Sequence, residues 1–322
     1  WINASICPND KLIKDILSLE MNEGLFDEHE HIIAFRSGNF KDSVDCQKSY
    51  TDVAFTHIQN LWDIFSKNAI ELEADFELIT QGRTSQKANA TNNILGEENL
   101  FIEEGAVLNC AIINASSGPV YIGKDAEVME GSIIRGPFAL CEASQTKLGA
   151  KIYGPTTVGP HSKVGGELNN VVIFGYSNKG HDGFIGNSVL GEWCNIGADS
   201  NNSNLKNNYA EVRLWNYASG HFAHTGLQFC GLIMADHSKC SINTMFNTGT
   251  VVGVCANIFG TGFPRNFIPS FSWGGPKGQS TFIISKAFEV SEKVMARRNI
   301  VFDENEKKIL TKVFELSKDF RR

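Results

Sequence analysis

The stretch Ile122–Val164, IGKDAEVMEGSIIRGPFALCEASQTKLGAKIYGPTTVGPHSKV, has an aliphatic residue at almost every sixth position. Seven of the eight positions in this phase are aliphatic, and Thr146 is the exception. This period fits neither an amphipathic helix, which repeats about every 3.6 residues, nor an ordinary strand, which alternates about every two. A solenoid of short strands and turns has such a period, with the aliphatic side chain of each strand pointing inward. The aliphatic positions are Ile122, Val128, Ile134, Leu140, Ile152, Val158 and Val164.

The period continues toward the C-terminus. It slips by two residues in VGGELNNV (164–171), and we expect it to resume at Val172 and to recur at Leu190 and Ile196. The alternative is chance spacing in a β-sandwich, and the regularity of the first eight positions argues against it. The sequence therefore predicts a mainly β protein built on a left-handed parallel β-helix of hexapeptide repeats. A further run follows at Met234, Cys240, Phe246, Val252 and Ile258.

The segment before the repeats lacks this period. Residues 1–90 are predicted to form an α/β segment, in which residues 1–16 give a strand followed by a helix. Thr51–Thr80 has apolar residues at helical spacing, which predicts one or two connecting helices. Gln81–Asn99, with its Ser, Asn and Gly residues, is interpreted as a linker into a β-helix domain of residues 91–278.

Two further segments depart from the period. Residues 279–322 have helical periodicity with a break near Asp303, which predicts a C-terminal helical tail that closes the open end of the solenoid. The insert Leu214–Phe229 interrupts the hexads, so we expect it to protrude as a loop. Loops of this kind often build sites on rigid scaffolds.

Composition excludes several classes of protein. The net charge of −7 disfavours a nucleic-acid surface, which needs a basic stripe to neutralise phosphates. The eight cysteines are scattered without a C-x-x-C pair, which is typical of a reduced, cytoplasmic protein and of neither a disulfide framework nor a zinc site. No apolar run is long enough to span a bilayer, so no membrane partner is expected. Because the first residue is Trp1, the sequence leaves open a preceding segment.

The stretch Asn178–Tyr209, NKGHDGFIGNSVLGEWCNIGADSNNSNLKNNY, places His181 between glycine-rich hexads and an asparagine-rich loop. Spacing alone favours a surface histidine in a turn for His181, and turn geometry for Asn201, Asn202, Asn207 and Asn208. A histidine is nevertheless a suitable base for acyl transfer from a thioester to an amine, because its pKa lies near neutrality. Spacing does not decide between these readings.

A family resemblance favours the catalytic reading. From about residue 50 to 275 the chain resembles the acetyltransferase half of the bifunctional N-acetylglucosamine-1-phosphate uridyltransferase/glucosamine-1-phosphate acetyltransferase and related sugar-nucleotidyltransferase-like proteins. The departures are Phe184 and Leu205, where the family has tyrosines. The matching residues are Gly180-His181, Phe184, Ile185-Gly186, Leu190-Gly191, Asn195-Ile196-Gly197-Ala198 and Asn204.

The resemblance implies roles for these residues. His181 would be the catalytic base, Asn195 and Asn204 would contact the sugar, and the backbone of Ala198 would meet acetyl-coenzyme A. The substrate would be an amino-sugar phosphate or a sugar nucleotide, and no metal would be required. Hexapeptide acyltransferases of this family build their sites between subunits, which implies a homotrimer. The phosphate-binding residues have no one-to-one match; Arg135, Lys163, Lys179 and Lys206 are the candidates.

Three other functions are weighed. A nucleotidyltransferase would need a glycine-rich phosphate loop, which this chain lacks, and residues 1–90 would then be the remainder of that domain. A non-catalytic trimerising scaffold is favoured by Phe184 and Leu205. A metal-dependent hydratase of the carbonic anhydrase kind is disfavoured, because its close pair of histidines five residues apart is absent. The sequence favours an acetyl-coenzyme A dependent acyltransferase.

Overall fold

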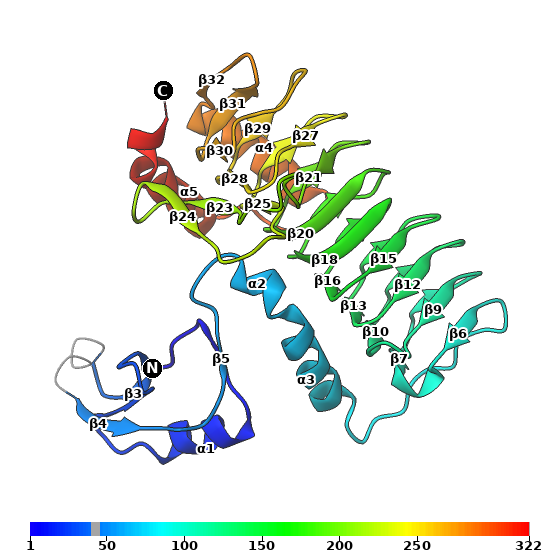
Figure 1. Ribbon diagram of the computed structural model, residues 1–322, viewed down its shortest axis with the longest axis vertical. Coiled ribbons are helices and arrows are strands. Elements are labelled where there is room, and N and C mark those ends of the chain that lie inside the picture. The colour runs from blue at the N-terminus through cyan, green and yellow to red at the C-terminus, as the bar shows by residue number, and fades with distance from the viewer. Residues whose placement is uncertain (40–45, 322) are drawn as a thin grey trace. The chain divides into compact units, whose positions relative to one another are not determined.

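The computed structural model of the protein describes residues 1–39 and 46–321, and it divides the chain into two compact units, Trp1–Asp63 and Ile64–Arg322 (Figure 1). The N-terminal segment was predicted to extend to residue 90. The division falls earlier because the helices that follow Asp63 belong to the β-helical unit.

The N-terminal unit combines a helix with short strands. Residues 1–16 contain the predicted strand and helix, which are confirmed as β1 and α1. The side chain of Asn9 accepts hydrogen bonds from the backbone of Lys11 and Leu12, and thereby caps α1. Strand β2 pairs antiparallel with β3 and parallel with β4, while β1 pairs antiparallel with β5. The elements are β1 (Ile6–Cys7), α1 (Asp10–Ser18), β2 (Glu23–Phe26), β3 (Ile32–Arg36), β4 (Gln47–Tyr50) and β5 (Thr56–His57).

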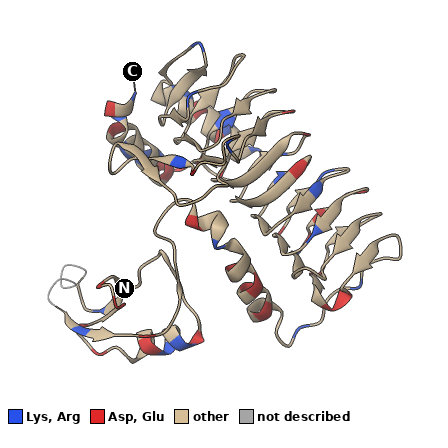
Figure 2. Ribbon diagram, viewed as in Figure 1, with Lys and Arg blue, Asp and Glu red and all other residues tan. Residues whose placement is uncertain are grey.

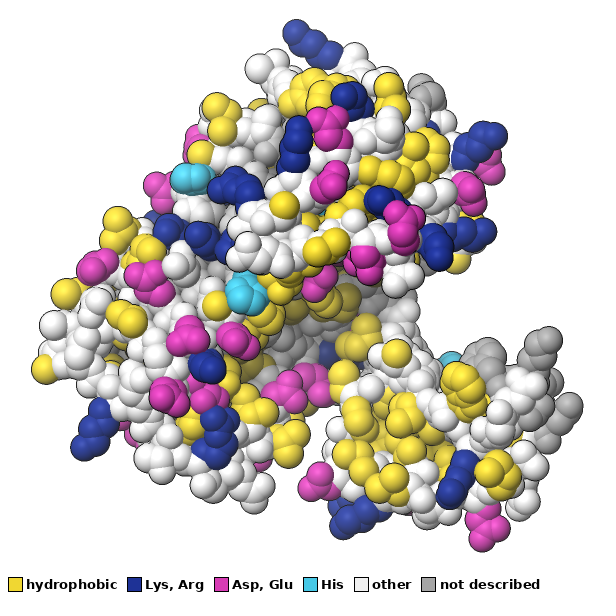
Figure 3. All heavy atoms as spheres, turned by 180° about the vertical axis from the view of Figure 1, so that it is seen from behind, with side chains coloured by type: hydrophobic (Ala, Val, Ile, Leu, Met, Phe, Trp, Pro, Cys, Tyr) yellow, Lys and Arg dark blue, Asp and Glu magenta, His cyan; other side chains and the backbone are white. Residues whose placement is uncertain are grey.

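The core of this unit is small, and part of its surface is apolar. Its buried cluster consists of Ile6, Leu12, Leu19, Leu25, Ile33 and Ala34. Figure 3 shows hydrophobic side chains gathered on one face of the unit. Its exposed large apolar residues include Trp1, Ile2, Leu17 and Met21.

Two helices begin the second unit. Helices α2 (Asp63–Ser66) and α3 (Asn68–Thr80) confirm the C-terminal part of the helical prediction for Thr51–Thr80. The N-terminal part of that prediction is wrong, because residues 56–57 form β5 and pair with β1. Helix α3 is fixed to the solenoid by Asn68, whose amide donates to the carbonyl of Pro155 at 3.0 Å and accepts from the Thr157 hydroxyl at 2.9 Å. Its other side chains include several acidic residues (Figure 2), beside the exposed Ile70 and Leu78.

The rest of the unit is a stack of β-coils. Its strands form a 13-stranded and a 10-stranded sheet in which successive coils pair in parallel, apart from the terminal β31–β32 hairpin. This confirms the predicted fold class, a mainly β protein with a left-handed parallel β-helix, an α/β segment before it and helices after it.

The 13-stranded sheet covers two sides of the coil, which meet in the long strands. The first side contains β6 (Asn93–Leu95), β9 (Ile112–Asn114), β12 (Ile133–Arg135), β15 (Lys151–Tyr153) and the N-terminal halves of β18 (Glu167–Ile173) and β20 (Phe184–Leu190). The second contains β7 (Leu100–Ile102), β10 (Val120–Ile122), β13 (Phe138–Leu140), β16 (Thr156–Val158), the C-terminal halves of β18 and β20, and then β25 (Leu232–Met234), β28 (Thr250–Val252) and β30 (Phe267–Ile268).

The 10-stranded sheet forms the remaining side. It contains β8 (Val107–Leu108), β11 (Glu127–Val128), β14 (Gln145–Thr146), β17 (Lys163–Val164), β19 (Asn178–Lys179), β21 (Asn195–Ile196), β26 (Lys239–Cys240), β29 (Asn257–Ile258), β31 (Ser272–Gly275) and β32 (Gly278–Thr281). Strands β22 (Asn201–Asn202) and β27 (Met245–Phe246) form a separate pair, and a 3-10 turn, η2 (Glu97–Asn99), lies in the first coil.

The hexads point inward as predicted. All eight positions from Ile122 to Val164 are buried, and the exception Thr146 is buried with them. The predicted phase after the slip is wrong at Val172, which is half-buried, whereas Val171 and Ile173 are in the core. The reason is a short coil: Val158 pairs with Ile173. The earlier coils, as from Ile122 to Leu140, are longer.

The insert and the tail pack beside the coils. Leu214–Phe229 contains a protruding hairpin of β23 (Arg213–Asn216) and β24 (His221–His224). The tail forms α4 (Ile284–Ala296), α5 (Glu304–Leu316) and the 3-10 turn η3 (Lys318–Phe320). The tail packs its apolar side chains on residues of several successive coils, and its last residues, including Phe320, lie at the end of the solenoid. The coil residues in these contacts include Trp193, Cys255 and Phe271.

An aromatic ladder lies on the corner that the tail covers. The rings of His161, Tyr176, Trp193 and His237 stack in that order, with centroids 4.9, 4.2 and 6.2 Å apart. All four residues have a positive φ of 58–59°, which few non-glycine residues adopt. Ser291 of α4 lies with its hydroxyl 3.3 Å from Nδ1 of His237. Among the described residues, no helix is both long and apolar enough to cross a membrane.

Candidate active site

The predicted base lies on a corner of the solenoid. His181 follows β19 in the turn 180–183, and its side chain is exposed. Its ring makes no hydrogen bond with any residue in the described part of the chain. The turn rests on Gly166, which has a φ of +70° and could not be replaced without strain, since a Cβ would lie 2.7 Å from the Gly183 carbonyl oxygen. The close approach of these two backbones therefore shapes the corner beneath the histidine.

A lysine occupies an inward position directly before this corner. In the 10-stranded sheet, Val164 pairs with Lys179, and Ile196 follows one coil later in the same column. Lys179 is 1% exposed, so its side chain takes the place of an aliphatic residue in the core. A charged group at such a position is costly unless its hydrogen bonds are satisfied, which makes it unusual for a structural residue. The column runs through Leu108, Val128, Thr146, Val164, Lys179, Ile196, Cys240 and Ile258.

The ammonium group of Lys179 supports the corner from inside. Its Nζ donates to the carbonyl of Gly165 at 3.0 Å and to the carbonyl of His181 at 2.5 Å. Burial lowers the pKa of Lys179 to about 8, against the opposing effect of Asp182 and Asp199. The lysine thus ties the backbone of the histidine to the previous coil. This internal role replaces the phosphate contact expected from the sequence.

The strand after the corner is held by asparagines. The backbone amide of Phe184 donates to Oδ1 of Asn201, and that of Gly186 donates to Oδ1 of Asn202, both at 2.8 Å. Asn204 donates to the side chain of Asn187 at 2.7 Å. Asn201 and Asn202 therefore satisfy backbone groups that have no ladder partner in the next coil. Their role is structural.

Phe184 and Asn204 meet over one glycine. A Cβ on Gly186 would lie 2.5 Å from the Phe184 ring and 2.8 Å from Nδ2 of Asn204. The predicted site residue Asn204 thus lies beside Phe184, on the strand that follows His181. Phe184 brings an aromatic ring but no hydroxyl to this position.

The remaining predicted residues are distributed around this corner. Ala198 lies in the equivalent corner one coil later, where the amide of Asp199 donates to the carbonyl of Asp182 at 3.0 Å. The backbone N–H of Ala198 makes no hydrogen bond within the described residues, so it can donate to a ligand. Asn195 is exposed at the start of β21, about 10 Å along the strand from this corner.

The basic candidates are less well placed. Arg135 lies on β12, three coils before Gly186 and therefore about 14 Å away. Lys206 lies two residues after Asn204, and its ammonium donates to the carbonyl of Glu211 at 2.6 Å. Lys163 lies on the opposite end of β17 from the corner, and burial and nearby arginines lower its pKa.

One basic residue was missed by the sequence analysis. The side chain of Lys147 lies across the glycines of this corner, since Cβ atoms on Gly165 and Gly180 would lie 3.2 and 3.8 Å from it. Lys147, Gly165 and Gly180 each come directly after an inward-pointing residue of the same column. These inward residues are Thr146, Val164 and Lys179. The register of the coils could have identified Lys147, because it shares a column with Gly165 and Gly180.

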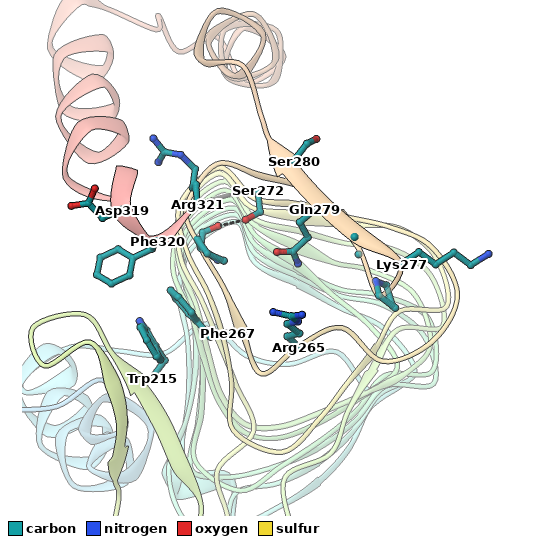
Figure 4. Close-up of a pocket in the computed structure, with 14 residues that line it drawn as sticks. Trp215, Arg265, Phe267, Ser272, Lys277, Gln279, Ser280, Asp319, Phe320 and Arg321 are labelled. Atoms are coloured by element: carbon teal, nitrogen blue, oxygen red, sulfur yellow. Dashed lines mark hydrogen bonds between the residues drawn. The ribbon is translucent and has the colours of Figure 1, made fainter.

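A cavity of about 530 Å³ lies elsewhere, at the C-terminal end of the solenoid (Figure 4). It is lined by Trp215, which stacks on Phe267 at 4.1 Å, and by Arg265 and Phe320. The strands beside it, including β31, are four coils beyond β19, or about 19 Å away. The cavity is therefore separate from the histidine corner, which is an open surface in the single chain.

The chain was compared with protein-family models, solved structures and curated proteins. A family model described as sugar nucleotidyl transferase matches residues 1–84. Among solved structures, the chain is similar to UDP-N-acetylglucosamine acyltransferase from Campylobacter jejuni, with 19% identity over 73% of this chain and 83% of that chain and a TM-score of 0.25. Comparison with curated proteins gave no match.

Proposed function

We propose that the protein transfers an acetyl group from acetyl-coenzyme A to the amine of an amino-sugar phosphate or sugar nucleotide, with His181 as the general base. The observation that carries the proposal is the construction of the corner: an exposed imidazole whose backbone is held by a buried lysine ammonium at 2.5 Å. A buried charge is a costly way to stabilise a turn. The buried lysine therefore supports the proposal that the exact position of His181 is important for function.

The chemistry follows from the groups at this corner. The amine nitrogen attacks the thioester carbonyl, the C–N bond forms, and the imidazole of His181 takes the proton from nitrogen. The C–S bond then breaks, and the imidazolium returns the proton to the departing thiolate. The N–H of Ala198 would donate to the carbonyl oxygen as negative charge develops there. Asn195 and Asn204 would bind sugar hydroxyls, and Lys147 would join Arg135 and Lys206 as candidate phosphate contacts.

The match of residues 1–84 to a sugar nucleotidyl transferase family supports a substrate that contains a sugar phosphate. It also favours a second candidate function, in which the chain is related to sugar-1-phosphate nucleotidyltransferases and the β-helix serves mainly as a trimerising scaffold. A homotrimer is part of both proposals. In the first, the neighbouring subunit would complete the open histidine corner.

Thiol release from acetyl-coenzyme A tests the first proposal. We would assay the full chain with a panel of amino-sugar phosphates and amino-sugar nucleotides, beside His181→Ala and the exposed-histidine control His221→Ala. A general base predicts a fall of about 10²-fold or more in kcat for His181→Ala alone. Equal activity in all three proteins would remove His181 from its role. Absence of thiol release with every acceptor would favour the scaffold function.

A further inference from the structure

The N-terminal unit brings together three side chains with metal-ligating atoms. Asp27 directly follows β2, His31 precedes β3, and His57 lies on β5. One ligand atom from each of the three lies within 4.8 Å of the others. The rings of His31 and His57 meet edge to face, with centroids 5.5 Å apart. Residues from two separate parts of the unit thus converge on one point.

The carboxylate of Asp27 is already oriented. Its Oδ1 accepts the backbone N–H of His29 at 2.9 Å and that of His31 at 2.8 Å. This leaves Oδ2 directed at Nδ1 of His31, 2.9 Å away. Hydrogen bonds that hold the outer atom of a ligand are typical of metal sites, because they fix the ligand before the ion arrives. Gln59 provides a similar contact, with its Nε2 at 3.2 Å from Nδ1 of His57.

We propose that Asp27, His31 and His57 bind a divalent transition-metal ion, with Zn²⁺ the ion that the ligand set fits best. Two imidazoles and one carboxylate, with a water molecule in the fourth position, form a common tetrahedral zinc set. Ligand atoms about 2.1 Å from such an ion lie about 3.4 Å from one another. Small rotations of the three side chains would therefore bring their ligand atoms from within 4.8 Å of one another to the spacing that the ion needs.

An ion pair between Asp27 and His31 alone is the simpler alternative. It accounts for the distance of 2.9 Å, but it gives no role to the approach of His57 from another strand. His29 is the useful contrast. It lies in the same turn, with its ring 6.1 Å from that of His31, but it is outside the set of three.

A bound ion would connect the β2–β3 turn to strand β5. These segments belong to separate sheets, β2–β3–β4 and β1–β5. The ion would bind the folded unit, in which the three ligands are close together, much more tightly than the unfolded chain, in which they are scattered. It would therefore raise the stability of the unit by mass action. The proposal does not depend on the acyltransferase function.

The test uses the full chain, stripped with a chelator and dialysed against Zn²⁺. We expect one ion retained per chain and a higher melting temperature than in the stripped protein. His31→Ala and His57→Ala should each lower the affinity at least about tenfold, as loss of a ligand does, while His29→Ala should retain it. Circular dichroism of the stripped variants checks that each has folded; if His57→Ala has not, His31→Ala decides.

Cobalt substitution identifies the ligands, because the chain also has eight cysteines. Co²⁺ bound by imidazole and carboxylate gives ligand-field bands without the charge-transfer band of thiolate ligation. A thiolate band, retention of Zn²⁺ by His31→Ala, or no retention by the unaltered chain would each overturn the proposal.

Discussion

The corners before and after strand β19 belong to one coil and have opposite surroundings. At the first corner, Tyr176 stacks on Trp193 at 4.2 Å within the aromatic ladder, and the C-terminal helices cover the outside. At the second corner His181 is exposed, and its support comes from inside, through Lys179. A corner stabilised by outer packing is closed to ligands. A corner that is supported from the core can keep its outer surface accessible to substrates.

Replacing Lys179 by methionine is the most direct test of whether the exposed corner depends on support from the core. Methionine fills a similar volume without a charge, so the fold should be retained or become more stable at neutral pH. The carbonyl of His181 would lose its donor, and a misplaced base lowers the rate. We expect kcat to fall by up to about 10²-fold with little change in KM. An unchanged kcat in a folded variant would assign Lys179 to the core alone.

The same variant has a signature in stability. In the folded state the pKa of Lys179 is about 8, against 10.5 for the ordinary group. Between these values the unfolded chain binds more protons, so stability rises with pH and the rise is complete above about pH 10.5. The full change is about 3 kcal/mol. Urea unfolding at pH 7.5 and pH 10, at one protein concentration, should show this rise in the unaltered chain and a smaller one in Lys179→Met.

The hexads show how much of the fold could be predicted from the sequence. From Ile122 to Val164 each residue's depth could be predicted, because the coils are equal in length and the period alone sets the register. Beyond Gly165 and Gly166 the coil shortens, and this places Ile173 in the core instead of Val172 and turns Lys179 inward. The short coil includes the left-handed residues Gly166, with a φ of 70°, and Asn170, with a φ of 57°, and a periodicity count does not contain such backbone conformations.

Features formed by residues far apart in the sequence could not be predicted either. The aromatic ladder needs the register of coils that are separated by an insert, as between Trp193 and His237. Asp27 and His57 approach through pairing of β1 with β5, which no local pattern encodes. The roles of His181, Asn195 and Asn204 remain predictions.

His237 provides the next test, on the covered corner. Burial, with a contribution from Lys239, lowers its pKa to about 4, and the residue is 5% exposed. Below about pH 6.5 the unfolded histidine binds a proton that the folded one does not, so stability is lost as pH falls toward 4. At pH 5 the loss is about 2 kcal/mol.

His237→Asn should remove this loss. Asparagine tolerates the positive φ of 59° at this position. The difference in urea midpoint between pH 7 and pH 5 should therefore shrink in the variant, with His221→Asn as a control for loss of an exposed histidine. If the difference stays the same, His237 is protonated in the folded protein, and the covered corner is more open than its packing shows.

The smallest effect is expected from Tyr176→Asn, which removes one ring of the ladder and keeps the left-handed backbone. Stacked aromatic pairs contribute about 0.5–1.5 kcal/mol beyond their buried area, so stability should fall by about 1 kcal/mol or somewhat more. The exposed corner is supported through Lys179 on the other side of β19, so thiol release should be unaffected. A loss of activity as large as that in Lys179→Met, at equal stability, would show that the two corners are coupled. The division between a structural and a functional corner would then fail.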